Sequence, residues 1–145
     1  MRSFAFGTRV SLALALLSGP LPADAPALSI GAVHARAPAS EFAPALKQVL
    51  REELSQAALP AKRGRAFVLD ATLVKLTAEK NDESVRATAV VSVVLRRARD
   101  STLHAMLSGK ATAEESASLE ATRDTALRAA VKSALRGLPQ AVAAE

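Results

Sequence analysis

Side chains able to do chemistry are few in this 145-residue sequence, and they form no recognisable grouping. A hydrolase would need four polar side chains to converge: Asp70, Arg86, His104 and Arg123. Asp70 falls in mid-strand and could instead pair with Arg86 across a hairpin, which would be a structural role. A histidine pair for a metal is missing, because His34 falls in the amino-terminal segment and leaves only His104 in the expected domain.

Motifs for bound phosphate, bound calcium or a nucleophilic serine are also missing. The run Ser108-Gly109-Lys110 lacks the earlier glycine and the following hydroxyl residue that a phosphate loop needs. The run Asn81-Asp82-Glu83 lacks the spacing and the glycine of a calcium loop. The sequence contains no cysteine, which excludes disulfides, thiol nucleophiles, cysteine zinc sites and a lipid-anchor cysteine. We therefore predict a protein that is not an enzyme, with no catalytic residue, metal or cofactor.

Five periodic segments would position these side chains. Residues 41–58 and 118–136 carry apolar side chains at three- and four-residue steps, which predicts two amphipathic helices. Residues 66–74, 85–96 and 102–109 alternate between apolar and polar side chains, which predicts strands joined by short turns. The predicted fold class is α+β, with two layers in the order α-β-β-β-α. An antiparallel three-stranded meander would carry both helices on one face.

This arrangement leaves one face of the sheet open. The stronger apolar sets, from Phe67 to Leu73, from Val85 to Leu95 and from Leu103 to Leu107, should face the helices. The open face would then present a candidate partner surface: Val68, Val74, Leu76, Val90, Val94 and Met106. Exposed aliphatic surface of this kind is often a docking site. Self-association, cover by the linker or tail, and a bulge that exchanges the faces stay open as alternatives.

The amino-terminal segment has the pattern of an export signal. Residues 1–25 read as a signal peptide, with cleavage possible anywhere from 23 to 35, and an uncleaved membrane anchor is the alternative. Residues 26–40 are rich in Pro and Ala and are predicted to be a linker, although Leu28–Val33 could add an edge strand. The α+β domain would span 41–139, followed by a tail at 140–145. The predicted location is periplasmic or secreted.

The formal net charge is +5, and basic side chains recur along the last predicted helix at Arg128, Lys132 and Arg136. We interpret them as a solvated helix face. Nucleic acid is disfavoured as a partner by the export signal and by the scarcity of aromatic side chains for stacking. Contact with a membrane is expected to be peripheral at most.

A resemblance to known proteins is carried by four segments of 42–139: AFVLDATLVKL, VRATAVVSVVLR, LHAMLSGKATAE and ALRAAVKSALRGLP. With them the sequence resembles exported proteins of myxobacteria and related Gram-negative bacteria. The order of elements is similar to that of small periplasmic modules, such as the amino-terminal domain of TolB and envelope lipoproteins that assist secretion or outer-membrane assembly. The missing lipid-anchor cysteine departs from the lipoprotein members. Together with the open sheet face, these observations predict a non-enzymatic periplasmic or secreted interaction module that docks an envelope protein through that face. The alternative is a carrier or sensor of a small ligand or lipid, with a cavity between sheet and helices.

Overall fold

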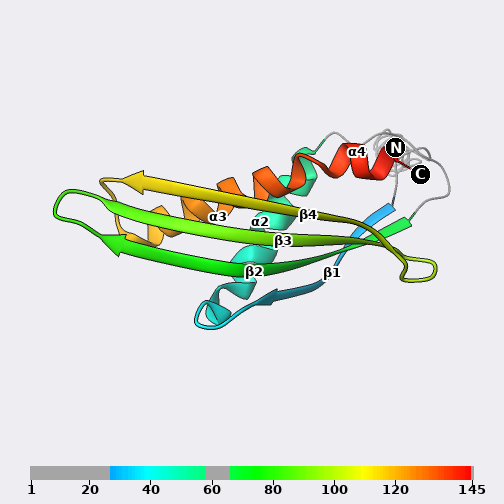
Figure 1. Ribbon diagram of the computed structural model, residues 1–145, viewed down its shortest axis with the longest axis horizontal. Coiled ribbons are helices and arrows are strands. Elements are labelled where there is room, and N and C mark those ends of the chain that lie inside the picture. The colour runs from blue at the N-terminus through cyan, green and yellow to red at the C-terminus, as the bar shows by residue number, and fades with distance from the viewer. Residues whose placement is uncertain (1–26, 58–65, 145) are drawn as a thin grey trace, which may run out of the picture.

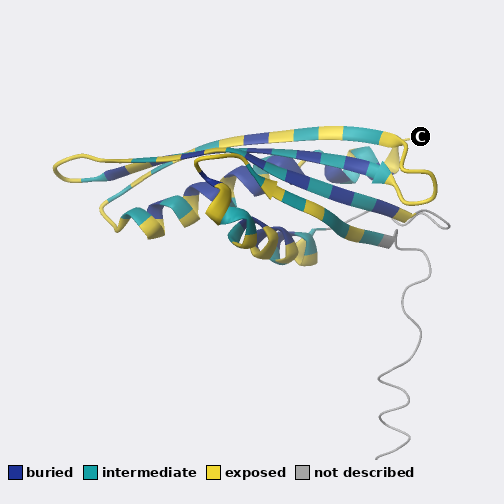
Figure 2. Ribbon diagram, turned by 90° about the horizontal axis from the view of Figure 1, so that it is seen from below, coloured by how far each residue is buried: buried dark blue, intermediate teal, exposed yellow. Residues whose placement is uncertain are grey.

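The computed structural model describes residues 27–57 and 66–144, which form one sheet with helices on one side of it (Figure 1, Figure 2). The elements are, in chain order, β1 (Ala27–Ala35), the 3-10 helix η1 (Ser40–Phe42), α2 (Ala43–Gln56), β2 (Ala66–Lys80), β3 (Val85–Arg97), β4 (Leu103–Glu115), α3 (Leu119–Leu135) and α4 (Leu138–Ala143). The strands lie in the order β1-β2-β3-β4. β1 is parallel to β2, and the other neighbours are antiparallel.

The predicted α+β fold is confirmed, with its antiparallel meander and its helices on one face. The prediction that 26–40 is a linker is wrong for residues 27–35, which form β1 and make the sheet four-stranded and mixed. Leu28 and Ile30 of β1 pack against the core, and β2 supplies the hydrogen-bonding partner. Parallel strands need a long crossover between them, and α2 provides it.

The folded unit is wider than the predicted 41–139. It begins with β1, and α4 continues to Ala143, so the expected tail is partly helical. Leu138 and Val142 of α4 are fully buried in the core. The predicted signal peptide lies outside the described residues. A cut at the far end of the predicted cleavage range, after Ala35, would remove β1 from the sheet. Within the described part of the chain, no helix is long and apolar enough to span a bilayer.

Small side chains allow α3 to lie close to the sheet. The helix buries three alanines toward the strands, Ala126, Ala130 and Ala134. Gly109 of β4 lies beneath them, and a methyl group at Gly109 would overlap the backbone of Ala130 and Ala134. Glycine within a strand often marks such a close approach of another backbone. This contact fixes how α3 crosses the sheet.

A bulge in β2 changes which side chains face the helices. Leu73 pairs with Val91 of β3, and Lys75 pairs with the adjacent residue Val90. Val74 therefore has no partner residue and is an extra residue in the ladder. One extra residue reverses the alternation of a strand. Leu76 is therefore buried beneath the helices, and the prediction that it lies on the open face is wrong for this reason.

A second bulge does the same near the start of β4. Leu103 pairs with Arg96 of β3, and Ala105 pairs with the adjacent residue Leu95. His104 is therefore the extra residue. His104 turns to the helix side, where its Nε2 donates a 2.6 Å hydrogen bond to the carbonyl oxygen of Ala141. Its ring centroid lies 5.0 Å from that of Phe67. Leu103 is exposed on the open face, so the expected faces of both residues are wrong.

Candidate functional site

The sheet face that points away from the helices is covered by no described element (Figure 2). Its half nearest the β2–β3 turn is polar. The hydroxyl oxygens of Thr88 and Thr112 lie 3.1 Å apart across β3 and β4, and Arg86 forms a 3.0 Å ion pair with Glu114. Neighbouring polar side chains that are already paired offer little apolar area to a partner. This half of the face is therefore an ordinary solvated surface.

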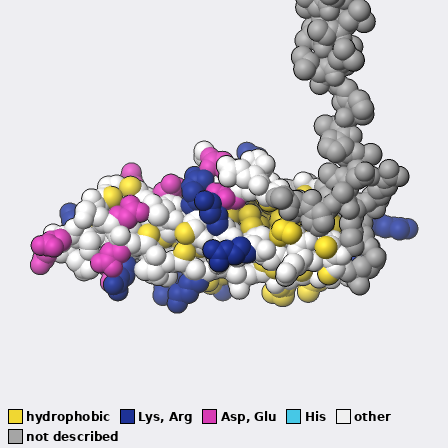
Figure 3. Space-filling model, turned by 90° about the horizontal axis from the view of Figure 1, so that it is seen from above, with side chains coloured by type: hydrophobic (Ala, Val, Ile, Leu, Met, Phe, Trp, Pro, Cys, Tyr) yellow, Lys and Arg dark blue, Asp and Glu magenta, His cyan; other side chains and the backbone are white. Residues whose placement is uncertain are grey.

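The half nearest the β3–β4 turn carries apolar side chains, which we call the open-face patch: Val68, Val94, Leu103 and Met106. Val94 is directly opposite Met106, while Val68 and Leu103 flank Arg96 from either side. Met106 is 66% exposed and Leu103 is 56% exposed, whereas Val68 and Val94 are half-buried. Figure 3 looks onto the β4 edge of the sheet, not onto the open face, and shows more hydrophobic side chains in the half of the molecule away from its acidic end.

The open-face patch contains three of the six residues predicted for the partner surface: Val68, Val94 and Met106. Val90 is on the same face, but its cross-strand neighbours are Lys75 and Lys110, so it is isolated from the patch. Val74 is the bulged residue, and Leu76 is on the other face. Leu103 was missed because the bulge that exposes it has no signal in the alternation. The functional role of these residues stays a prediction.

A polar clamp at Asp70 lies beside the open-face patch. Its carboxylate accepts a 2.6 Å hydrogen bond from Nε of Arg96 on β3 and a 2.8 Å hydrogen bond from the backbone N–H of Ala32 on β1. The hydrogen bond from Arg96 lowers the pKa of Asp70 more than partial burial raises it. Gly31 is needed here because a side chain at that position would overlap the carboxylate. The expected pairing of Asp70 with Arg86 is wrong, and the clamp is structural.

The four side chains of the hydrolase hypothesis do not converge. Asp70 pairs with Arg96, Arg86 pairs with Glu114, and His104 is on the opposite face of the sheet from both. The guanidinium carbon of Arg123 lies 5.5 Å from the ring centroid of Phe42, between helices. Among the described residues, no group of three His, Asp or Glu side chains is placed to hold a metal ion.

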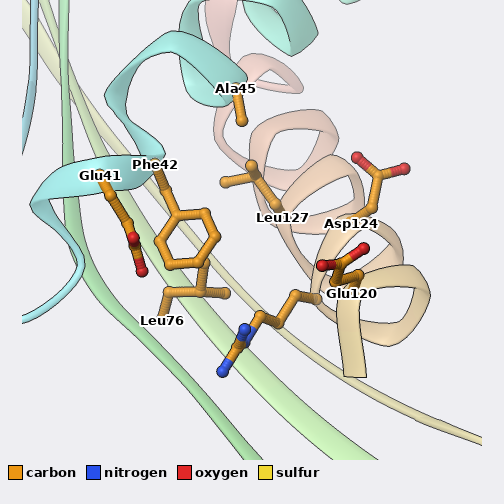
Figure 4. Close-up of a pocket in the computed structure, with 8 residues that line it drawn as sticks. Glu41, Phe42, Ala45, Leu76, Glu120, Asp124 and Leu127 are labelled. Carbon is orange, nitrogen blue, oxygen red and sulfur yellow. The ribbon is translucent and has the colours of Figure 1, made fainter. Parts of the chain in front are cut away.

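A pocket of about 410 Å³ opens between η1, α2, α3 and the far end of β2, as Figure 4 shows. Its lining residues are Glu41, Phe42, Ala45, Leu76, Glu120, Arg123, Asp124 and Leu127. The apolar floor exists because the β2 bulge turns Leu76 to this side, where it lines the pocket together with Phe42 and Leu127. Pockets of about 300–1,000 Å³ are typical of small-molecule sites. Sequence reasoning missed this pocket, because its lining comes from four separate elements.

The predicted basic face of α3 is partly neutralised. Nη1 of Arg128 forms ion pairs with Glu52 at 2.6 Å and with the buried Glu53 at 3.3 Å, both on α2. The hydrogen bond to Glu52 raises the pKa of Arg128. Arg128 therefore joins the two helices, while Lys132 and Arg136 are exposed as expected.

No family model matches the chain, and no curated protein sequence matches it. Solved structures do match. Protein XCC0632 from Xanthomonas campestris superposes with a TM-score of 0.59 at 13% identity, over 84% of this chain and 90% of that one. The PelC dodecamer from Paraburkholderia phytofirmans gives a TM-score of 0.57 at 10% identity, over 79% and 91% of the two chains.

A Caulobacter crescentus protein described as a lipoprotein gives a TM-score of 0.51 at 13% identity, over 80% of this chain and 87% of that one. At these identities the likeness establishes a shared fold. It agrees with the resemblance to envelope lipoproteins at that level. It does not bear on the amino-terminal domain of TolB or on myxobacterial proteins.

Proposed function

We propose that this protein is a non-enzymatic interaction module of the bacterial envelope, periplasmic or secreted, that docks another envelope protein through the open-face patch. One observation carries the proposal. Among the described residues, the two large hydrophobic side chains that are more than half exposed are Leu103 and Met106, and they lie together on an uncovered sheet face. Apolar side chains that gather on one exposed surface commonly mark a protein interface.

The outer edge of β4 gives further support to the open-face patch as a docking site. β4 is the last strand in the sheet order, so the outer row of its backbone N–H and C=O groups has no strand partner among the described residues. Such a row pairs readily with an added strand. Leu103 and Met106 belong to this strand, so a partner strand and the apolar contact would meet at one place.

A second copy of the chain is the main competitor to a different envelope protein as the partner. The fold neighbour PelC is a dodecamer, which supports self-association as a possibility. A patch and a strand edge on the same element would serve either partner. The mass of the purified protein in solution distinguishes a second copy of the chain from a different envelope protein as the partner.

The test is crosslinking in living cells with the protein tagged at its carboxy terminus. Replacing Met106 with glutamate should abolish the crosslinked product, because it places a charge in the centre of the apolar contact. Thr112→Glu is the matched control, since Thr112 is exposed on the same strand and the same face, in the polar half. Val90→Glu is a weaker probe, because Val90 lies between two lysines.

Loss of one defined product with Met106→Glu, and its retention with Thr112→Glu, would support docking. A product of twice the monomer mass would assign the patch to self-association. Recovery of the monomer alone, or equal loss in both variants, would overturn the proposal.

A second candidate function is that of a carrier or sensor for a small ligand. The pocket of about 410 Å³ between sheet and helices favours it, because this is the cavity that such a role requires. It uses the helix side of the sheet, so it is independent of the open-face patch.

A further inference from the structure

The pocket beneath η1 and α3 has an apolar floor. Leu76 and Leu127 are buried side chains of the core, yet both line the pocket (Figure 4). Phe42 and Ala45 form the wall on the η1 and α2 side, and both are half-buried. A ligand that enters would therefore place an aliphatic group against aliphatic and aromatic carbon, which is favourable by the area that it removes from water.

The rim of the pocket is acidic, although the chain as a whole is basic. Glu41, Glu120 and Asp124 are exposed carboxylates of the lining, and Arg123 is its one cation. No hydrogen bond or ion pair involves these three carboxylates in the described part of the chain. In Figure 4 the carboxylates of Glu41 and Glu120 lie on the two sides of the Phe42 ring, while that of Asp124 points away from it. The local charge is thus opposite in sign to the formal net charge of +5.

The aromatic ring at this rim already holds a cation. The guanidinium of Arg123 lies over Phe42, with its central carbon 5.5 Å from the ring centroid. A cation within about 6 Å of an aromatic face is attracted by the negative charge of that face. Because Arg123 already pairs with the Phe42 ring, the rim attracts a further positive group through its carboxylates.

We propose that this pocket binds a small cationic amphiphile. The aliphatic part lies against Leu76 and Leu127, and the ammonium group lies at the rim between Glu41 and Glu120. This inference rests on the second candidate function above and names its ligand class. The sequence did not determine the charge of the small ligand or lipid of the carrier hypothesis, because the charge of the rim is known only from the fold.

The experiment compares three probes with the same eight-carbon chain: octylammonium, octanol and octanoate. Binding to the full chain is measured by calorimetry, and the site is located by NMR shift changes at Phe42, Leu76 and Leu127. We expect octylammonium to bind at least about fivefold more tightly than octanol at low salt, with octanoate weakest. The preference should shrink as salt rises, because exposed charges are screened.

Two variants assign the result to the pocket. The double variant Glu41→Gln and Glu120→Gln should remove the preference for octylammonium and leave octanol binding unchanged. Glu83→Gln, an exposed carboxylate in the β2–β3 turn, is the matched control and should change nothing. Ala45→Leu should block all three probes, because it fills the pocket from α2 without removing a charge.

The outcomes separate the ligand class from the carrier role. If octanoate binds as tightly as octylammonium and Ala45→Leu blocks both, the proposal of a cationic ligand is wrong, while the carrier function is still supported. Octylammonium binding that survives Ala45→Leu, or no binding of any probe, would overturn both. Circular dichroism melts of each variant show whether a loss of binding comes from unfolding.

Discussion

Replacing Asp70 with asparagine should destabilise the protein and loosen β1. The carboxylate joins three strands, because it belongs to β2, accepts a hydrogen bond from Arg96 on β3 and accepts another from the backbone of Ala32 on β1. The amide of Ala32 donates to Oδ1 and Nε of Arg96 donates to Oδ2, and asparagine has an uncharged NH2 group in place of one of these oxygens, so it can satisfy only one of the two donors. The hydrogen bond from the other donor and the ion pair with Arg96 are lost.

The expected loss is about 1–2 kcal/mol of unfolding free energy. A hydrogen bond to a charged group contributes roughly 1.5–3 kcal/mol when it is shielded from water, and an exposed ion pair about 0–1 kcal/mol. The side chains of Arg96 and Asp70 are 32% and 24% exposed, so the pair lies between these limits. Urea unfolding of the variant and the parent at pH 7 measures the difference.

The pH dependence gives a sharper check. Pairing lowers the pKa of Asp70 in the folded state, so its contribution is complete above the ordinary aspartate pKa of about 4. It is lost as pH falls below that value toward the lowered pKa, because protonation then removes the charge in the folded state too. The difference between parent and Asp70→Asn should therefore shrink at acid pH.

The control is Glu114→Gln, which breaks the ion pair with Arg86 on the same sheet face. Both side chains of that pair are about half exposed, so its loss should be smaller than that of Asp70→Asn. Hydrogen exchange of the Ala32 amide should accelerate in Asp70→Asn and not in Glu114→Gln. Equal stability of Asp70→Asn and the parent at pH 7, or a difference unchanged by acid, would refute the reasoning.

Two further changes test the packing of α3. Gly109→Ala should cost about 3 kcal/mol or prevent folding, because the methyl group overlaps the backbone at Ala130, whereas Gly137→Ala meets only a flexible leucine side chain. Equal thermal stability of these two glycine variants would contradict that packing. Arg128→Ala should cost about 1–3 kcal/mol, because it leaves the buried carboxylate of Glu53 without its cation. Adding Glu53→Gln should recover part of that loss in urea unfolding, and no recovery would show that Arg128 acts through other contacts.

Local patterns predicted the main elements well. The regular alternation from residue 85 to 96 became β3, at Val85–Arg97, because every second side chain is buried against the helices. The predicted helix at 118–136 became α3, which begins after Ser118, where the serine side chain accepts a hydrogen bond from the amide of Ala121. Both signals depend on neighbours within the same element, so the sequence contains them.

β1 was harder to predict, because its stability comes from distant residues. The run Leu28–Val33 is short and sits beside Pro/Ala-rich sequence, which favoured a linker. In the fold, α2 returns the chain to a parallel strand, and the Asp70 carboxylate binds the backbone of Ala32, where the β1 ladder is irregular. Neither partner is visible from the alternation of the segment itself.

The sequence by itself determined the fold class, the helix-covered face and the absence of the motifs tested. Only the tertiary structure decided which side chains form each surface. A prediction from periodicity assumes that side chains alternate at every residue of a strand. A bulge adds one residue, and only the pairing with the neighbouring strand shows it. For this reason Leu76 lines the pocket and Leu103 belongs to the open-face patch, each on the face opposite to the predicted one. The acidic rim likewise needs η1 and α3 to meet, because its carboxylates are far apart in the chain and their summed charge exists only once the elements pack together.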